Sequence, residues 1–186
     1  MSDTITDKQK LCAELERELP HFTGSEEYTR IRYPWLRKDF LLTDGAKHLA
    51  DKAKAYWLMD IIASHQTNKR VNTQPFQLWK IYVCTGESFQ PDPGAFLSVQ
   101  AALDFKSPKA ERILEFQPDE PPTPAALVEW KKSAKAGSAL VICDDGNGNM
   151  LALQNIPYTD FPLDEFKLYV TNDDFNGIVV MLTSEY

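Results

Sequence analysis

The sequence has few of the features that mark secreted, membrane-spanning or disulfide-stabilised proteins. No apolar run approaches the roughly 20 residues that a transmembrane helix needs, and the polar, acidic start of the chain has no apolar leader segment. The three cysteines, Cys12, Cys84 and Cys143, are far apart and odd in number. They suit a reducing compartment better than a disulfide framework. We therefore expect a cytoplasmic protein with no membrane contact.

Residue patterns typical of common active sites are also scarce. The three histidines form no metal-ligand pattern, and the cysteines offer no CxxC or nucleophile motif. The turn Gly146-Asn147-Gly148 lacks the lysine and the following helix of a phosphate loop. We therefore assign no catalytic residue, metal ion or cofactor, and we favour a protein that is not an enzyme.

Positive charge is nearly absent from the C-terminal quarter of the chain. Residues 140–186 contain one basic residue, Lys167, against eight acidic ones, so their net charge equals the −7 of the whole chain. Most of these acids lie in predicted turns, where they serve solubility and turn geometry. The alternative is an acidic surface for a basic partner. Nucleic acid is disfavoured as that partner, because its phosphates would be repelled.

Two helices are predicted in the first third of the chain. The first covers 6–19, where leucines recur every fourth residue until Pro20 ends the helix. The second covers 44–64 and is capped by Thr43 or Asp44. Its first half is amphipathic and its second half is apolar all round, so we expect this helix to enter the core.

Strands are predicted over most of the remaining chain. They comprise a short segment up to residue 33 and the segments 75–84, 139–143, 150–154, 166–170 and 178–182. Asn-, Asp- and Gly-rich turns join the last four strands into two hairpins, which indicates antiparallel pairing.

The segment at about 87–136 has a different character. Prolines punctuate it, and two hydroxyl–proline pairs mark helix starts, so we predict a helical insertion there. The predicted fold class is α+β, with a mostly antiparallel sheet and helices packed on one face. At 186 residues, the chain is expected to form a single domain over 1–186 that contains this insertion.

Asp60 is the first candidate for a functional site. On a helical wheel it falls on the buried stripe of the 44–64 helix, with Ser64 one turn further along. A buried carboxylate must be paired, hydrogen-bonded or protonated. The functional hypothesis is an acidic pocket lined by Trp57 and Ser64. The structural alternative, which we favour, is a hydrogen bond to a donor in the core.

Asp160 is the second candidate. Structurally, it orders its loop by accepting a backbone N–H group two residues further on. For metal binding or acid/base chemistry it needs a partner, and Asp44 and Asp60 are the acids that could meet it. A separate basic and aromatic stretch, 28–38, could contact single-stranded nucleic acid. We expect its four basic residues to pair with the acidic C-terminal end instead.

Five short phrases stand out at the two ends of the chain. They are Phe22-Thr23-Gly24-Ser25-Glu26 with Tyr28, Thr43-Asp44-Gly45, Tyr56-Trp57-Leu58, Tyr158-Thr159-Asp160-Phe161-Pro162-Leu163 and the final Ser184-Glu185-Tyr186. In order and spacing they resemble an uncharacterised family of bacterial and phage domains of unknown function. The resemblance implies no particular chemistry. The occurrence of this family in phages and mobile elements implies a host-interaction or accessory role.

We interpret the chain as a cytoplasmic, non-enzymatic binding or accessory protein that acts through contacts with another protein and serves a phage or mobile element. The sequence identifies neither that partner nor the oligomeric state. The alternative is a small-molecule-binding protein or hydrolase with an acidic pocket that contains Asp60 and Asp160. A third interpretation is nucleic-acid contact through residues 30–38.

Overall fold

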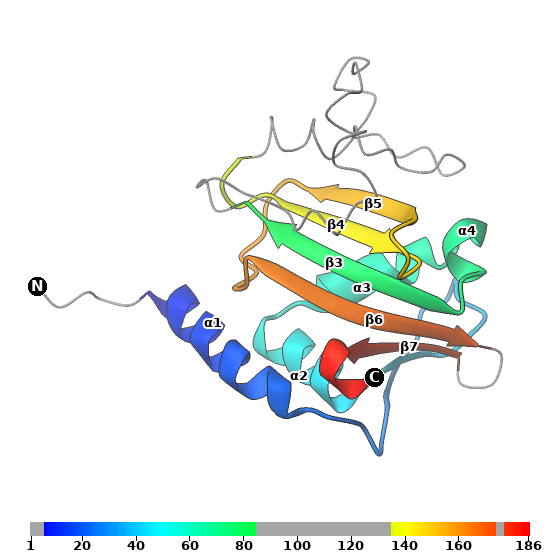
Figure 1. Cartoon of the computed structure of the whole chain (residues 1–186), viewed down its shortest axis with the longest axis horizontal. Helices are drawn as coiled ribbons and strands as arrows, with labels where there is room; N and C mark the ends of the chain where they lie inside the picture. Colours follow the sequence, from blue (N-terminus) through cyan, green and yellow to red (C-terminus); the bar gives the residue numbers. More distant parts are fainter. Residues whose placement is uncertain (1–5, 85–134, 174–176) are drawn as a thin grey trace, which may run out of the picture.

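The computed structural model describes residues 6–84, 135–173 and 177–186. Over these residues the fold is α+β, as predicted, with a seven-stranded sheet that carries its main helices on one face (Figure 1). The predicted insertion at about 87–136 lies outside the described residues, except for its last two positions. No helix in the described parts of the chain is long and apolar enough to cross a membrane.

The described strands have the following bounds: β1 Thr29–Ile31, β2 Phe40–Leu42, β3 Phe76–Val83, β4 Ala139–Asp144, β5 Met150–Ile156, β6 Glu165–Asp173 and β7 Gly177–Leu182. The helical elements are α1 Asp7–Glu18, η1 Leu19–His21, α2 Asp44–Lys52, α3 Tyr56–His65, α4 Lys69–Asn72 and the C-terminal 3₁₀ turn η4 Thr183–Glu185. The strand order is β1-β2-β7-β6-β3-β4-β5. Of these neighbouring pairs, β2 and β7 run parallel and the others antiparallel.

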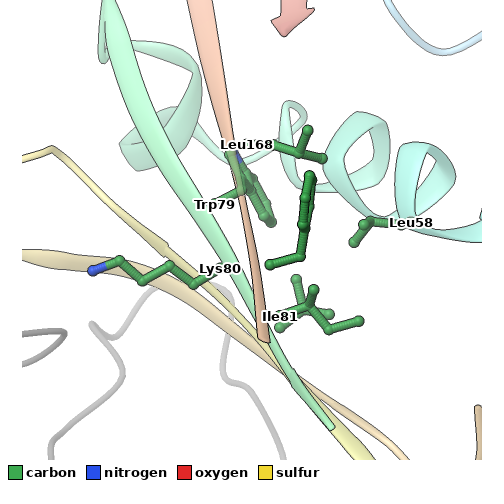
Figure 2. Close-up of a pocket in the computed structure, with 7 residues that line it drawn as sticks. Leu58, Trp79, Lys80, Ile81 and Leu168 are labelled. Atoms are coloured by element: carbon green, nitrogen blue, oxygen red, sulfur yellow. The ribbon is translucent and has the colours of Figure 1, made fainter. Parts of the chain in front are cut away.

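Alternate residues of β3 face opposite sides of the sheet. Trp79 and Ile81 point toward α3, where they meet Leu58 of that helix and Leu168 of β6 (Figure 2). Lys80, between them in sequence, points away from this group (Figure 2). This period of two places the apolar side chains of the central strand under the helices. The hydrophobic core therefore lies between the sheet and the α2–α3 layer.

The prediction of one continuous helix over 44–64 is wrong, because the structure divides this segment into α2 and α3. Lys54 has a φ of +51°, and the N–H groups of Lys54 and Ala55 bond back to the carbonyls of Asp51 and Ala50. These two bonds form the Schellman motif, which usually places glycine at the left-handed position. Since lysine takes that position here, the sequence carries no helix-stop signal between the two halves.

Other predicted elements are confirmed. α1 matches the helix expected at 6–19, and the two predicted hairpins are the antiparallel pairs β4–β5 and β6–β7. Thr43 is the N-cap of α2, with its hydroxyl accepting the N–H of Ala46. The strand β2 was not predicted, because three residues are too few to show an alternating pattern.

α1 is held against α2 by an ion-paired cluster at Glu18. The Glu18 carboxylate accepts hydrogen bonds from Lys52 Nζ at 2.6 Å and His48 Nε2 at 2.9 Å. Lys52 Nζ also lies 3.0 Å from Glu14 Oε2. The bonds from Lys52 and His48 lower the pKa of Glu18 from 4.5 to about 2.

This shift predicts a pH dependence of stability. Because the folded-state pKa of Glu18 is depressed, its contribution is fully present above pH 4.5 and is lost as the pH falls toward about 2. Glu18→Gln is therefore expected to flatten the decrease of the unfolding free energy in this pH window, as measured by urea unfolding. The exposed-site variant Glu26→Gln should keep the wild-type slope. An unchanged slope in Glu18→Gln would contradict the assignment.

Candidate functional site

An open groove of about 390 Å³ lies between α3 and the connection from β5 to β6. α3 contributes Trp57 and Ile61, which lie one helical turn apart. The other wall consists of Ile156, Tyr158, Thr159 and Asp160. Tyr158 is 74% exposed, whereas Ile61 is buried. We refer to these six residues as the groove.

The walls of the groove are fixed by contacts behind them. The Trp57 ring stands edge-on to the fully buried ring of Phe161, with centroids 6.2 Å apart. Thr159 donates its backbone N–H to the Gly137 carbonyl at 2.7 Å, and its hydroxyl accepts the N–H of Phe161 at 3.1 Å. An added Cβ at Gly137 would lie 3.3 Å from the Tyr158 ring, so this ring lies close over the glycine. These contacts anchor the connection to Gly137 and to α3.

Asp160 is an exposed acid of the groove. Within the described residues, its carboxylate makes no hydrogen bond or ion pair. The prediction that Asp160 orders its loop is wrong, because Thr159 makes the side-chain bond to the backbone two residues on. The Asp160 carboxylate is thus available to a ligand.

Asp60 lies on the exposed side of α3, so the prediction that it is buried is wrong. Its Oδ1 accepts a hydrogen bond of 2.7 Å from the Tyr33 hydroxyl. Partial burial and this bond to a carboxylate raise the pKa of Tyr33. Ser64 is also exposed and donates to the carbonyl of Ile61. The helical wheel misplaced Asp60 and Ser64 because it treated residues 44–64 as one continuous helix. The break at Lys54 starts a new helix, so positions counted from residue 44 no longer give the correct face.

Asp44 lies in a different place, at the first turn of α2, with its side chain exposed. Its backbone N–H donates to the hydroxyl of Ser25 at 2.7 Å. Of the five predicted pocket residues, the structure brings Trp57 and Asp160 together in the groove. It places Asp60, Ser64 and Asp44 outside the groove lining.

The start of α2 instead contacts the C-terminal turn η4, through a cluster that we call the Glu185 clasp (Figure 1). The Glu185 carboxylate accepts hydrogen bonds from the hydroxyls of Ser25 at 3.0 Å and Thr43 at 2.6 Å. It also accepts the backbone N–H groups of Gly45 at 3.0 Å and Leu182 at 2.9 Å. A carboxylate at a helix N-terminus satisfies free N–H groups and interacts favourably with the helix dipole. The clasp therefore joins three distant segments of the chain.

The five phrases noted in the sequence meet in these two places. The first, second and last phrases supply Ser25, Thr43, Gly45 and Glu185 of the clasp, and the other two supply Trp57 and Tyr158 of the groove. Sequence reasoning did not single out Glu185, Tyr158 or Ile156 as site residues. Glu185 and Tyr158 could have been found from their positions in these phrases. No sequence pattern pointed to Ile156.

A second cavity of about 320 Å³ is lined in part by Trp35, Arg37 and Lys38. Lys38 Nζ donates to the amide oxygen of Asn172 at 2.9 Å. Arg30 pairs with Asp39 at 2.9 Å, so its predicted pairing with the acidic C-terminal end is wrong. No group of three or more His, Cys, Asp or Glu side chains in the described residues is placed to hold a metal ion.

The chain matches a family model, whereas no curated protein and no solved structure matches it. The model of the Family of unknown function (DUF6876) matches residues 13–93 and 112–186. The internal gap, 94–111, falls inside the predicted insertion, although the match resumes before the predicted end of that insertion. Since the matched residues make up most of the chain and include the groove and the clasp, the protein belongs to this family of unknown function.

Proposed function

We propose that this chain is a cytoplasmic, non-enzymatic binding protein that acts through contacts with another protein, and that the groove is its contact surface. The observation that carries the proposal is an open groove of about 390 Å³ whose rim holds a tyrosine that is 74% exposed. Tyrosine and tryptophan are enriched among the residues that dominate binding energy in protein interfaces. Tyr158 and Trp57 provide both residue types in one place.

The chemistry of the groove favours binding over the alternative of a hydrolase. Acid/base catalysis by a carboxylate pair would need Asp60 beside Asp160, and Asp60 lies outside the groove lining. An open groove also covers less of a small molecule than the enclosed pockets that small ligands usually occupy. A side chain that projects from a partner protein fits such a shape, because the rest of the partner covers the rim.

The accessory role for a phage or mobile element is the finer part of this proposal. It is supported by the resemblance of the five phrases at the two ends of the chain. For a protein with that role, the partner recovered from cells should be a protein of the host.

Tyr158→Ser is expected to reduce recovery of the partner at least about tenfold in affinity purification of the tagged full chain, because truncation of an interface tyrosine often costs 2 kcal/mol or more. The matched control is Tyr28→Ser, which removes a tyrosine that is 53% exposed and lies outside the groove. We expect the control to recover the partner as the wild type does. Circular dichroism and thermal unfolding verify that each variant is folded.

Two outcomes would contradict the proposal. Equal recovery by wild type and Tyr158→Ser would place the contact elsewhere on the chain. Recovery of no stoichiometric protein by the wild type, at low or at high salt, would remove the basis for a protein partner. The small-molecule alternative would then become the leading interpretation.

A further inference from the structure

We infer that the groove binds an arginine side chain presented by the partner protein, an inference that rests on the function proposed above. The aromatic walls of the groove, the charge inside it and the net charge of the segment that forms one wall each point to this group.

The walls match the two parts of an arginine side chain. Trp57 and Tyr158 supply two aromatic rings, on which a planar guanidinium can stack. Ile61 and Ile156 supply apolar surface, against which the aliphatic stem of the same side chain can pack. A purely apolar side chain would use only the isoleucines and the ring faces.

The charge inside the groove is negative. Asp160 is the charged residue of the lining, and within the described residues its carboxylate has no hydrogen bond or ion pair. A guanidinium can donate two parallel hydrogen bonds to one carboxylate, which a lysine ammonium does not do with the same geometry. Arginine is the side chain that meets all three conditions. Its aliphatic part packs on the isoleucines, its guanidinium plane stacks on the aromatic rings, and its paired N–H groups donate to the Asp160 carboxylate.

The segment of the chain that forms one wall is acidic overall. Residues 140–186, which supply four of the six groove residues, have eight acids against the single cation Lys167. That cation lies 3.5 Å from the Glu165 carboxylate, which offsets its charge. A net negative charge on this segment favours the approach of a cationic partner over an anionic one.

Contacts behind Trp57 and Thr159 reduce the cost of binding. Phe161 packs against the Trp57 ring, the Tyr158 ring lies close over Gly137, and Thr159 is bonded to the backbone on both sides. Side chains that are already ordered lose little entropy when a ligand arrives. We therefore expect a single arginine to bind measurably in the absence of the rest of the partner.

The test uses the full ¹⁵N-labelled chain and blocked tripeptides in which glycines flank arginine, lysine or norleucine, followed through the indole N–H resonance of Trp57. We expect the arginine peptide to shift this resonance at about one-tenth of the concentration that the neutral norleucine peptide needs. The concentration that the lysine peptide needs should lie between those of the other two peptides. Asp160→Asn is expected to remove most of the arginine preference and to leave norleucine binding unchanged. The control Asp164→Asn, an exposed acid outside the lining, should keep the preference.

The outcomes separate this inference from the function on which it rests. Equal binding of arginine and norleucine peptides, or an arginine preference that survives in Asp160→Asn, would overturn the arginine assignment. A failure of all three peptides to shift the Trp57 resonance would overturn it as well. In each case the groove remains a protein contact if Tyr158→Ser still loses the partner in affinity purification.

Discussion

Lys80→Met is expected to lower the free energy of unfolding by about 3–5 kcal/mol, the range for removing one partner of a buried ion pair. Lys80 Nζ and Asp144 Oδ2 are 2.8 Å apart, and their side chains are only 5% and 2% exposed. The substitution keeps the length and apolar packing of the stem but leaves the carboxylate of Asp144 without its counter-charge. Its bond from the N–H of Gly146, at 2.8 Å, offsets only part of that cost. Urea unfolding of the variant measures the loss.

Two further variants identify the cause of the loss. Lys167→Met makes the same substitution at the residue paired with Lys80 across the sheet, where the side chain is 39% exposed. Its surface pair with Glu165 contributes about 0–1 kcal/mol, so this control should cost much less than Lys80→Met. The double variant Lys80→Met with Asp144→Asn should recover more than half of the loss, because asparagine keeps an oxygen for Gly146 and carries no charge. A single variant as stable as the wild type would show that the pair contributes nothing.

Glu185→Gln is expected to lower the unfolding free energy by about 2–3 kcal/mol, because it leaves donors of the clasp without an acceptor. The carboxylate accepts four hydrogen bonds, shared between its two oxygens. Glutamine keeps one oxygen and turns an NH₂ group toward the donors of the other. The loss of the negative charge also weakens the interaction with the helix dipole of α2. Thermal or urea unfolding of the full chain checks this value.

The matched control for the clasp is Glu27→Gln, an exposed glutamate that should change stability by less than about 0.5 kcal/mol. Gly45→Ala tests the same cluster through packing. A Cβ there would lie 2.5 Å from Leu182 Cδ1 and 2.8 Å from Glu185 Oε2, so the clasp would have to open. We expect a loss of about 1–3 kcal/mol from this overpacking. Wild-type stability in both Glu185→Gln and Gly45→Ala would mean that the clasp does not hold α2 to the C-terminal turn.

In the helical segment 44–64, the sequence predicted the buried face correctly for α2 but not for α3. The periodicity of apolar residues correctly assigned Ala46, Leu49 and Ala50 of α2 to the core. The same wheel, continued through Lys54, placed Asp60 on the buried side, where the structure does not have it. A left-handed lysine carries no sequence signal, because its conformation depends on bonds formed by the folded helix end rather than on a glycine.

The groove shows a second limit. Trp57 and Asp160 were both candidates, but the sequence suggested Asp44 and Asp60 as the partners of Asp160. In the fold, the connection after β5 contacts Trp57 and Ile61 of α3, whereas Asp60 bonds to Tyr33 outside the groove lining. Which side of a helix meets a distant loop depends on the packing of that helix on the sheet.

By itself, the sequence determined the α+β class, the helix α1 and the two hairpins, because residue periodicity and turn residues act over short stretches of chain. It also determined the acidity of the C-terminal quarter. Only the tertiary structure decided that β2 pairs in parallel with β7, that Glu185 reaches the start of α2, and that Asp160 joins Trp57. These contacts join residues that are far apart in sequence, and they follow from strand order and helix packing, which no local pattern encodes.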